Sequence, residues 1–175
     1  DDAHYLFAGP GSPTYSMQQW CGSPVRELLA KKLSHGGIVT FASAAALTLG
    51  IRTVPVYEIY KVGMDPYWNE GLGILRELGI PASVIPHYDN AEGGSHDTRF
   101  CYLGERRLQM LESEMSADEY VLGVDEHTGL VINLDDESAQ VVGNSTVTLR
   151  KGSKQVVFSS GETFSLEEQI GRAHV

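Results

Sequence analysis

The sequence predicts an α/β fold with a parallel sheet at its core and an antiparallel β meander on one side. Short apolar runs alternate with helix-like segments over residues 5–115. From Tyr120 onward the pattern changes to alternating apolar and polar residues, interrupted by glycine and asparagine. The length of 175 residues, with 42% hydrophobic and 21% charged residues, fits one globular domain.

The expected elements follow from local patterns. Ser23 and Pro24 suit the start of a helix, because serine caps a free amide and proline tolerates the first turn. A second apolar run, residues 54–60, contains Glu58. The glycine-rich segment 9–15 is expected to be a turn. The remaining assignments are strands at 5–8, 38–41 and 82–85, helices at 23–33, 43–49, 71–79 and 98–115, and meander segments at 120–135, 140–152 and 154–166.

Composition excludes several function classes. The net charge of −10 argues against a nucleic-acid partner, and no apolar run is long enough to cross a membrane. Two cysteines, Cys21 and Cys101, form neither a disulfide framework nor a metal motif, and the six histidines lack metal-ligand spacing. We therefore expect a cytoplasmic protein without metal, cofactor or signal peptide.

Both ends of the sequence are unusual. The chain begins at Asp1 without methionine and enters a strand almost at once, so we expect a single domain over residues 1–169 that is incomplete at its N-terminus. The closing segment 170–175, IGRAHV, resembles the translation of a sequencing-adapter read-through. We expect it to be a non-native tail and exclude it from the fold; the alternative is an ordinary basic tail.

Ser43 is the candidate nucleophile. It follows the apolar strand 38–41 in the segment GGIVTFASAAALTLG, where its neighbours are alanines. A serine on a tight strand-to-helix turn exposes its hydroxyl above a sheet, and the next backbone N–H helps to bind an oxyanion. Phe41 stands where the usual G-x-S-x-G pattern has glycine. The alternative explanation is that small residues only pack a helix against the sheet.

A serine nucleophile needs a base and an orienting acid. His87 directly follows the expected strand 82–85, at the sheet edge where ligand sites gather, whereas His96 and His127 remain alternatives. Glu58 is the expected acid, because a carboxylate within an apolar run is costly unless it has a partner. The alternative is that this run is an exposed edge strand and Glu58 faces water.

Several of these segments together resemble the dipeptidase E and cyanophycinase family of serine peptidases. The segment around Ser43 is similar to the family elbow G-x-S-A-G-A, and IPHYDNAEGGSHDTRF, residues 85–100, is similar to N-P-H-F-x-N followed by G-x-T-R. VLGVDEHTGLVIN, residues 121–133, is similar to the cyanophycinase stretch G-I-D-E-x-T-A. YLFAGPGSPTY, residues 5–15, is similar to the glycine-rich strand end.

This resemblance implies a fold like that of class I glutamine amidotransferases, a flavodoxin-like three-layer sandwich with a mostly parallel sheet. It implies a triad of Ser43, His87 and Glu58, with backbone N–H groups of Gly11 and Ala44 in the oxyanion hole. It also implies that a first βαβ unit is missing before residue 1. Phe41 and Ala45 depart from the elbow glycines of the family, so Phe41 is expected to narrow the pocket or to mark an inactive branch.

The resemblance also suggests a substrate. An arginine stands at the position of Arg99 in the family, and arginine binds carboxylates with two hydrogen bonds. We expect a small aspartyl or otherwise acidic peptide or amide, with Asp97 receiving its free amine. The alternative is that Arg99 opens a helix and pairs with Glu105.

Three functions follow as hypotheses. The first is a serine hydrolase acting on such a peptide. A homodimer is one oligomeric state that the sequence allows. The second is a catalytically inactive binding or regulatory domain with the same fold. The third is an amidotransferase-type glutaminase, which ranks last because that class has a cysteine where this chain has Ser43.

Overall fold

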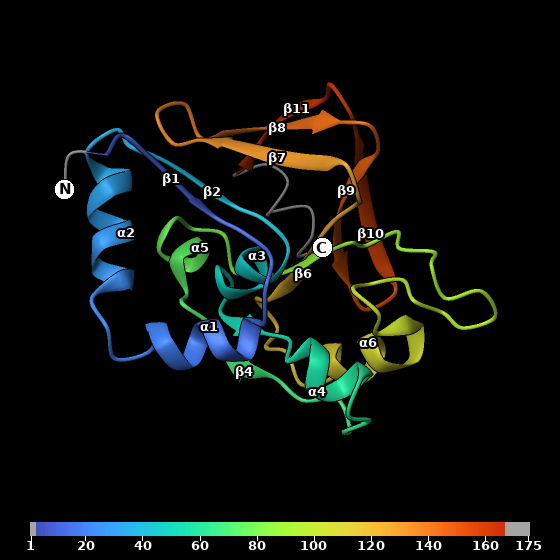
Figure 1. Ribbon diagram of the computed structural model, residues 1–175. Coiled ribbons are helices and arrows are strands. Elements are labelled where there is room, and N and C mark those ends of the chain that lie inside the picture. Colours follow the sequence, from blue (N-terminus) through green and yellow to red (C-terminus); the bar gives the residue numbers. More distant parts are fainter. Residues whose placement is uncertain (1–2, 167–175) are drawn as a thin grey trace.

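The largest sheet combines parallel and antiparallel pairing. In the computed structural model, which describes residues 3–166 of the chain, this sheet has the order β10-β9-β6-β5 (Figure 1). Strands β5 (Ala82–Pro86) and β6 (Tyr120–Val124) pair in parallel, with Pro86 opposite Val124. Strands β9 (Thr146–Lys151) and β10 (Lys154–Ser159) extend the sheet as an antiparallel hairpin. The parallel pair therefore brings the ends of β5 and β6 to the same edge.

A second parallel ladder lies apart from this sheet. It joins β1 (Tyr5–Ala8) to β2 (Ile38–Phe41), with Ala8 opposite Phe41. Two further sheets are antiparallel. One has the order β11-β8-β7, with strands Thr163–Ser165, Ser138–Gly143 and Thr128–Asn133, and the other is the short pair β3-β4, with strands Arg52–Thr53 and Asn69–Glu70.

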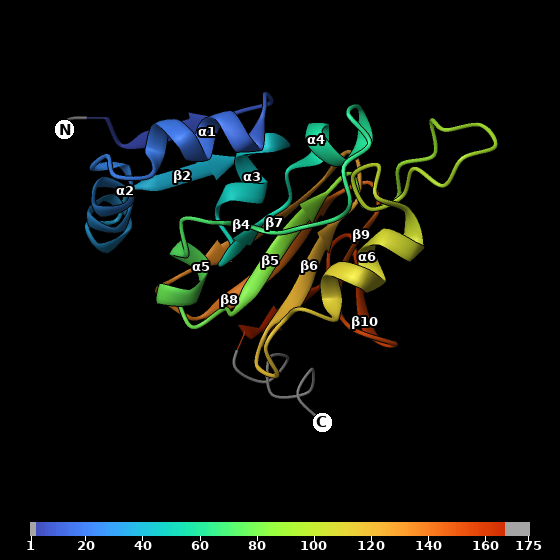
Figure 2. The ribbon, with the colours of Figure 1, turned by 90° about the horizontal axis from the view of Figure 1, so that it is seen from below.

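Six helices are assigned within residues 3–166, and most are short. Helices α1 and α2 lie beside the β1-β2 ladder, whereas α4 and α6 lie on the far side of α3 and β5 (Figure 2). Ser12 caps α1 by accepting a hydrogen bond from the Tyr15 N–H, and a proline follows in the first turn. The helices are α1 (Pro13–Trp20), α2 (Val25–Ser34), α3 (Ala44–Thr48), α4 (Val56–Tyr60), α5 (Ile74–Glu77) and α6 (Gly104–Glu112).

Three local expectations are corrected. The expected turn 9–15 ends in helix α1, and the apolar run 54–60 contains helix α4, so the alternative of an exposed edge strand is wrong. The expected helix 98–115 is shorter, because the segment before α6 has another conformation. Phe100, Cys101 and Tyr102 all have positive φ, of 62°, 54° and 67°, which is incompatible with a right-handed helix.

The core positions α3 between helices and sheet. Leu47 of α3 is fully buried in one apolar cluster with Ile85 of β5 and Val121 of β6. Ala46 belongs to a second cluster, which contains Val84 and the meander residues Val141 and Val147. Because α3 packs directly on β5, the N-terminus of α3 and the end of β5 are held close together.

The predicted mixed α/β class, with parallel strands first and an antiparallel extension after them, is confirmed. The flavodoxin-like layering stays a prediction, because the parallel pairs form two separate ladders of two strands. The expected tail, residues 170–175, lies outside the described residues. Among residues 3–166, no helix combines the length and the apolar character that crossing a membrane requires.

Candidate active site

Ser43 lies at the turn between β2 and α3. It occupies the N-cap position of α3 with φ 53° and ψ −122°, a conformation that residues with a side chain rarely adopt. The three alanines that follow are buried, and α3 packs on β5. The turn geometry and the packing of small residues are thus both present, and the role of Ser43 as a nucleophile stays a prediction. The turn is tight, and the small residues allow the helix to approach the sheet.

His87 meets Ser43 from the neighbouring strand end. It follows β5 directly, and its Nε2 lies 2.9 Å from the Ser43 Oγ. Its backbone also has a positive φ, of 51°. The carbonyl of His87 accepts hydrogen bonds from the N–H groups of Asn90 and Cys101, at 3.2 and 3.1 Å. These contacts hold the unusual backbone that directs the imidazole toward Ser43.

The carboxylate next to His87 belongs to Glu126. Its Oε1 lies 3.2 Å from His87 Nδ1 and accepts a second hydrogen bond, of 2.9 Å, from Asn90 Nδ2. Glu126 comes two residues after β6, the parallel neighbour of β5, and its N–H donates to Asp89 Oδ1. The hydrogen bond from Asn90, followed by that from His87, holds the pKa of Glu126 below its usual value. An ionised carboxylate at this place stabilises an imidazolium.

Glu58 does not occupy the place expected for the acid. It lies in α4, where its Oε2 is buried without a hydrogen-bond partner, and the structure has Glu126 rather than Glu58 at His87 Nδ1. The expectation rested on Glu58 lying within an apolar run, where a carboxylate is costly without a partner. The sequence showed only that Glu126 closely follows an apolar strand; that this strand, β6, pairs with the strand before His87 is seen in the structure.

The two alternative histidines, His96 and His127, have no hydrogen bond to Ser43. His96 is exposed in the segment between β5 and α6, and His127 is exposed immediately after Glu126. Within residues 3–166, no group of three or more histidine, cysteine, aspartate or glutamate side chains is gathered closely enough to hold a metal ion.

The two expected oxyanion-hole residues are placed differently relative to the Ser43 turn. Ala44 is next to it in the chain, whereas Gly11 follows the strand β1 that pairs with β2. Ala44 is the first residue of α3 and directly follows Ser43. Gly11 lies in the exposed loop after β1, whose last residue, Ala8, accepts a hydrogen bond of 2.9 Å from the Ala42 N–H. The loop of Gly11 thus begins beside the Ser43 turn, and its role as a donor stays a prediction.

Phe41, which stands where the G-x-S-x-G pattern has glycine, packs on α1. Its ring meets the edge of Trp20 at a centroid distance of 6.2 Å and an interplanar angle of 75°. Phe41 is partly buried and packs against two apolar clusters. One contains Met17 and Leu29, and the other is the cluster of Ala46 described above. An aromatic partner on a neighbouring helix therefore accommodates the bulky residue at this position.

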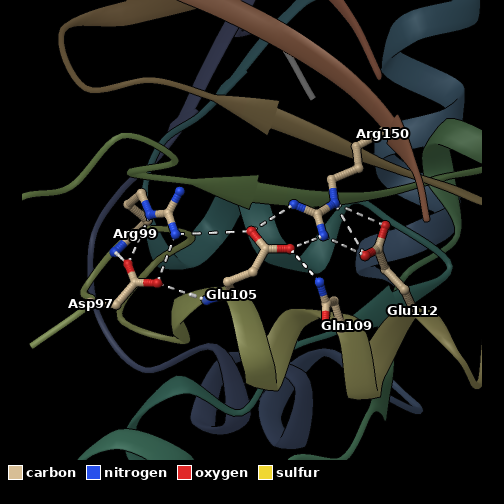
Figure 3. Close-up of polar contacts among 6 residues, drawn as sticks. All are labelled: Asp97, Arg99, Glu105, Gln109, Glu112 and Arg150. Atoms are coloured by element: carbon tan, nitrogen blue, oxygen red, sulfur yellow. Dashed lines mark hydrogen bonds and ion pairs between the residues drawn. The ribbon is translucent and has the colours of Figure 1, made fainter. Parts of the chain in front are cut away.

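Arg99 and Asp97 bind each other. Arg99 Nε and Nη2 donate to Asp97 Oδ1 and Oδ2 at 2.9 and 2.8 Å, and Asp97 Oδ2 also accepts the Glu105 N–H (Figure 3). The side chain of Arg99 holds the pKa of Asp97 well below its usual range. Arg99 also approaches Glu105, as the alternative expected, with Nη2 at 4.0 Å from Oε2. Both members of the pair are exposed and precede α6, which begins at Gly104, so Arg99 does not open that helix. Their role toward a substrate stays a prediction.

Comparison with known proteins gives matches to peptidases. The chain is 32% identical to Peptidase E of Nostoc sp. (strain PCC 7120) over 90 residues, which are 50% of this chain and 32% of that protein. No model of a known protein family matches the chain. The chain thus spans about a third of the length of the curated relative that it matches.

Two solved structures share the fold. A peptidase from an acI-B1 Actinobacterium matches 94% of this chain and 60% of its own, with a TM-score of 0.71 and 24% identity. A structure described as a putative Peptidase E protein from Listeria monocytogenes EGD-e matches 90% of this chain and 60% of its own, with a TM-score of 0.50 and 10% identity. Half of the chain is thus similar in sequence to a Peptidase E, and its fold is similar to those of two proteins named as peptidases.

Proposed function

We propose that the chain is a serine hydrolase that cleaves a peptide bond, with Ser43 as nucleophile, His87 as base and Glu126 as orienting acid. One observation supports this most directly. Ser43 Oγ, the His87 ring and the Glu126 carboxylate form a continuous hydrogen-bonded series of 2.9 and 3.2 Å. The series comes from three separate segments, and two of its members have a strained backbone.

The proposed reaction begins at the bond between Ser43 and His87. Nε2 takes the hydroxyl proton as Oγ attacks the carbonyl carbon, and Glu126 stabilises the resulting imidazolium. His87 then gives the proton to the leaving amine, so that the C–N bond breaks and an ester to Ser43 remains. Water, deprotonated by His87, attacks that ester, and the product leaves as a carboxylic acid with Ser43 regenerated.

The negative charge that develops on the carbonyl oxygen needs donors. The N–H of Ala44 comes at the start of α3, next to the nucleophile, and the loop of Gly11 begins beside it. We infer that both N–H groups bind the oxyanion. A donor of this kind contributes about 2.7–4 kcal/mol to transition-state stabilisation.

The proposed substrate is a small peptide or amide with an acidic group near the scissile bond. The relatives named as peptidases support the peptide, and Arg99 supports the acidic group. Because Asp97 already binds two nitrogens of Arg99, a substrate carboxylate would have to replace Asp97 or share the guanidinium with it. Asp97 would then be released toward the amino group of the substrate.

The proposal is tested with a fluorophosphonate probe, which forms a covalent bond only with an activated serine. We expect this chain to be labelled and S43A to lose all labelling. S34A is a matched control, because Ser34 is an exposed serine at the end of α2 whose hydroxyl donates to the Lys31 carbonyl. Labelling that persists in S43A, or absent labelling of a folded chain, would overturn the proposal and favour the binding domain.

A further inference from the structure

Asn90 lies beside the proposed triad as a buried side chain bonded to Glu126. We propose that Asn90 is a positioning residue of the site, which holds Glu126 in place and keeps it in the form of an acceptor. This inference rests on the proposed function. Asn90 is only 1% exposed, and its amide nitrogen donates to Glu126 Oε1 at 2.9 Å.

The orientation of the Asn90 amide follows from its two neighbours. Its Oδ1 accepts the Glu92 N–H at 3.3 Å, and its Nδ2 faces the carboxylate of Glu126. A backbone N–H requires an acceptor and a carboxylate requires a donor, so the flipped amide would lose both bonds. Asn90 therefore presents a donor to Glu126 in a defined direction.

The same oxygen of Glu126 also receives His87. Oε1 accepts from Asn90 Nδ2 and His87 Nδ1, at 2.9 and 3.2 Å, so both donors converge on one atom. A carboxylate has room for several donors, and each of them favours the ionised form. Asn90 thereby prevents Glu126 from rotating away from the imidazole, and it disfavours protonation of the acid.

Asn90 is itself fixed on both sides. Its N–H donates to the His87 carbonyl, and its own carbonyl accepts from the hydroxyl of Thr98, which is 3% exposed. Glu126 is further held by Asp89, which accepts its N–H at 2.7 Å. Four successive residues after β5, from His87 to Asn90, therefore carry the base together with two contacts that fix the acid.

The decisive variant is N90D. It preserves the size of the side chain and the acceptor for the Glu92 N–H, but it replaces the donor with a charged oxygen that faces Glu126. Asn133 offers a matched control, because its Oδ1 accepts the N–H of the residue two positions later, Asp135, as Asn90 does with Glu92. Its side chain has no hydrogen bond to Glu126. N133D thus reports what the change of asparagine to aspartate does in such a turn alone.

We expect fluorophosphonate labelling of N90D at neutral pH to be slower by about tenfold or more, since orientation is part of the 10²–10⁴-fold effect of a general base. The added negative charge near His87 favours imidazolium, so the acid-side midpoint of the labelling rate should move to higher pH. A purely structural role would lower stability and leave the labelling rate of the folded protein unchanged. N133D should label like the unmodified chain.

A double-mutant cycle with E126Q separates the possible results. If Asn90 acts through Glu126, N90D should add little to the defect of E126Q, whereas independent effects would multiply. Normal labelling of N90D with an unchanged midpoint, or full additivity, would overturn the role of Asn90 while the proposed function stands. Absent labelling of the unmodified chain would remove both. If N90D does not fold, N90S serves, because its hydroxyl still accepts from Glu92 and provides no amide donor.

Discussion

His87 Nε2 and Ser43 Oγ lie 2.9 Å apart, although 44 residues separate them in the chain. Both residues have a positive φ, of 51° and 53°, and each follows the last residue of its strand within two positions. Such backbone strain costs on the order of 1–3 kcal/mol per residue and persists only where the surrounding structure holds it. The hydrogen bond therefore joins two distorted turns, each supported by its own strand.

The strain at Ser43 gives a stability prediction. S43G should be more stable than S43A by about 1 kcal/mol, because glycine adopts φ 53° and ψ −122° without the side-chain penalty that alanine retains. Urea unfolding of the two variants measures the difference. At Ser34, the last residue of α2, the order should reverse, since alanine is favoured over glycine in a helix. Equal stability of S43G and S43A would contradict strain at this turn.

A second prediction distinguishes the two candidate acids. E126Q should slow fluorophosphonate labelling and peptide hydrolysis by roughly two or more orders of magnitude, because loss of a triad acid can cost about 10⁴. E58Q should label at nearly the normal rate, since Glu126 and not Glu58 bonds to His87 Nδ1. Labelling rates of the two variants, measured side by side, decide between them. A large loss in E58Q with normal labelling of E126Q would restore the assignment made from the sequence.

The case of Glu126 shows what the sequence could and could not reveal. The apolar strand before Ser43 and the strand before His87 were recognisable from local pattern, and parallel pairing brings strand ends to one edge. Glu126 follows β6, and its proximity to His87 depends on which strand pairs with β5. That pairing is a tertiary property, so the sequence alone offered several carboxylates.

The apolar run of Glu58 illustrates the same limit for the fold. Residues 54–60 form a short, mostly apolar run, and the pattern of such a run does not show whether it is a buried strand or a buried helix. Val56 and Ile59 of α4 are buried with Leu103 and Leu108, so packing against these residues stabilises the helical conformation. The left-handed turn at Phe100 also escaped prediction, because its residues carry no glycine signal.

A third prediction concerns the buried ion pairs of Arg150. Its guanidinium bonds to Glu105 and Glu112, and the Arg150 and Glu112 side chains are only 8% and 7% exposed (Figure 3). R150M should lower the free energy of unfolding by about 3–5 kcal/mol, because it leaves a buried carboxylate without its partner. Denaturant unfolding measures this loss. R150M combined with E112M should recover much of it, and an undiminished loss in the double variant would show that the unpaired charge is not the cause.

A fourth prediction is a pH dependence of stability through Asp97. Arg99 holds the pKa of Asp97 well below the unfolded value of about 4, so the ionised form stabilises the folded chain. This contribution is complete above the unfolded pKa and is lost as the pH falls through the folded pKa. D97N should therefore be less stable than the unmodified chain at pH 7, and the gap should narrow below about pH 4. Urea unfolding across this range tests it.

D118N is the matched control for this effect. Asp118 is exposed and forms an ion pair with Arg76 at 2.9 Å, but it accepts no backbone N–H comparable to that of Glu105 at Asp97. Exposed pairs of this kind contribute about 0–1 kcal/mol, so D118N should change stability only slightly. A gap between D97N and the unmodified chain that stays constant down to pH 2 would contradict the linkage.

The last prediction concerns Arg99 and the substrate. If Arg99 binds an acidic group, R99A should lose about 10–100-fold in kcat/KM for Asp-X dipeptides and little for Asn-X dipeptides, because hydrogen bonds to charged groups contribute about 1.5–3 kcal/mol. R99K retains the charge but loses the planar fork, so it should recover only part of this preference. R106A, at an exposed position of α6, controls for loss of positive charge nearby.

The variant D97N tests the role of Asp97, which occupies two nitrogens of Arg99 in the structure. If Asp97 only competes with the substrate carboxylate for Arg99, D97N should raise the affinity for Asp-X. It should lower that affinity if Asp97 binds the substrate amine. An equal Asp-X to Asn-X ratio in the unmodified chain and R99A would remove Arg99 from the pocket and leave it as the partner of Asp97 before α6.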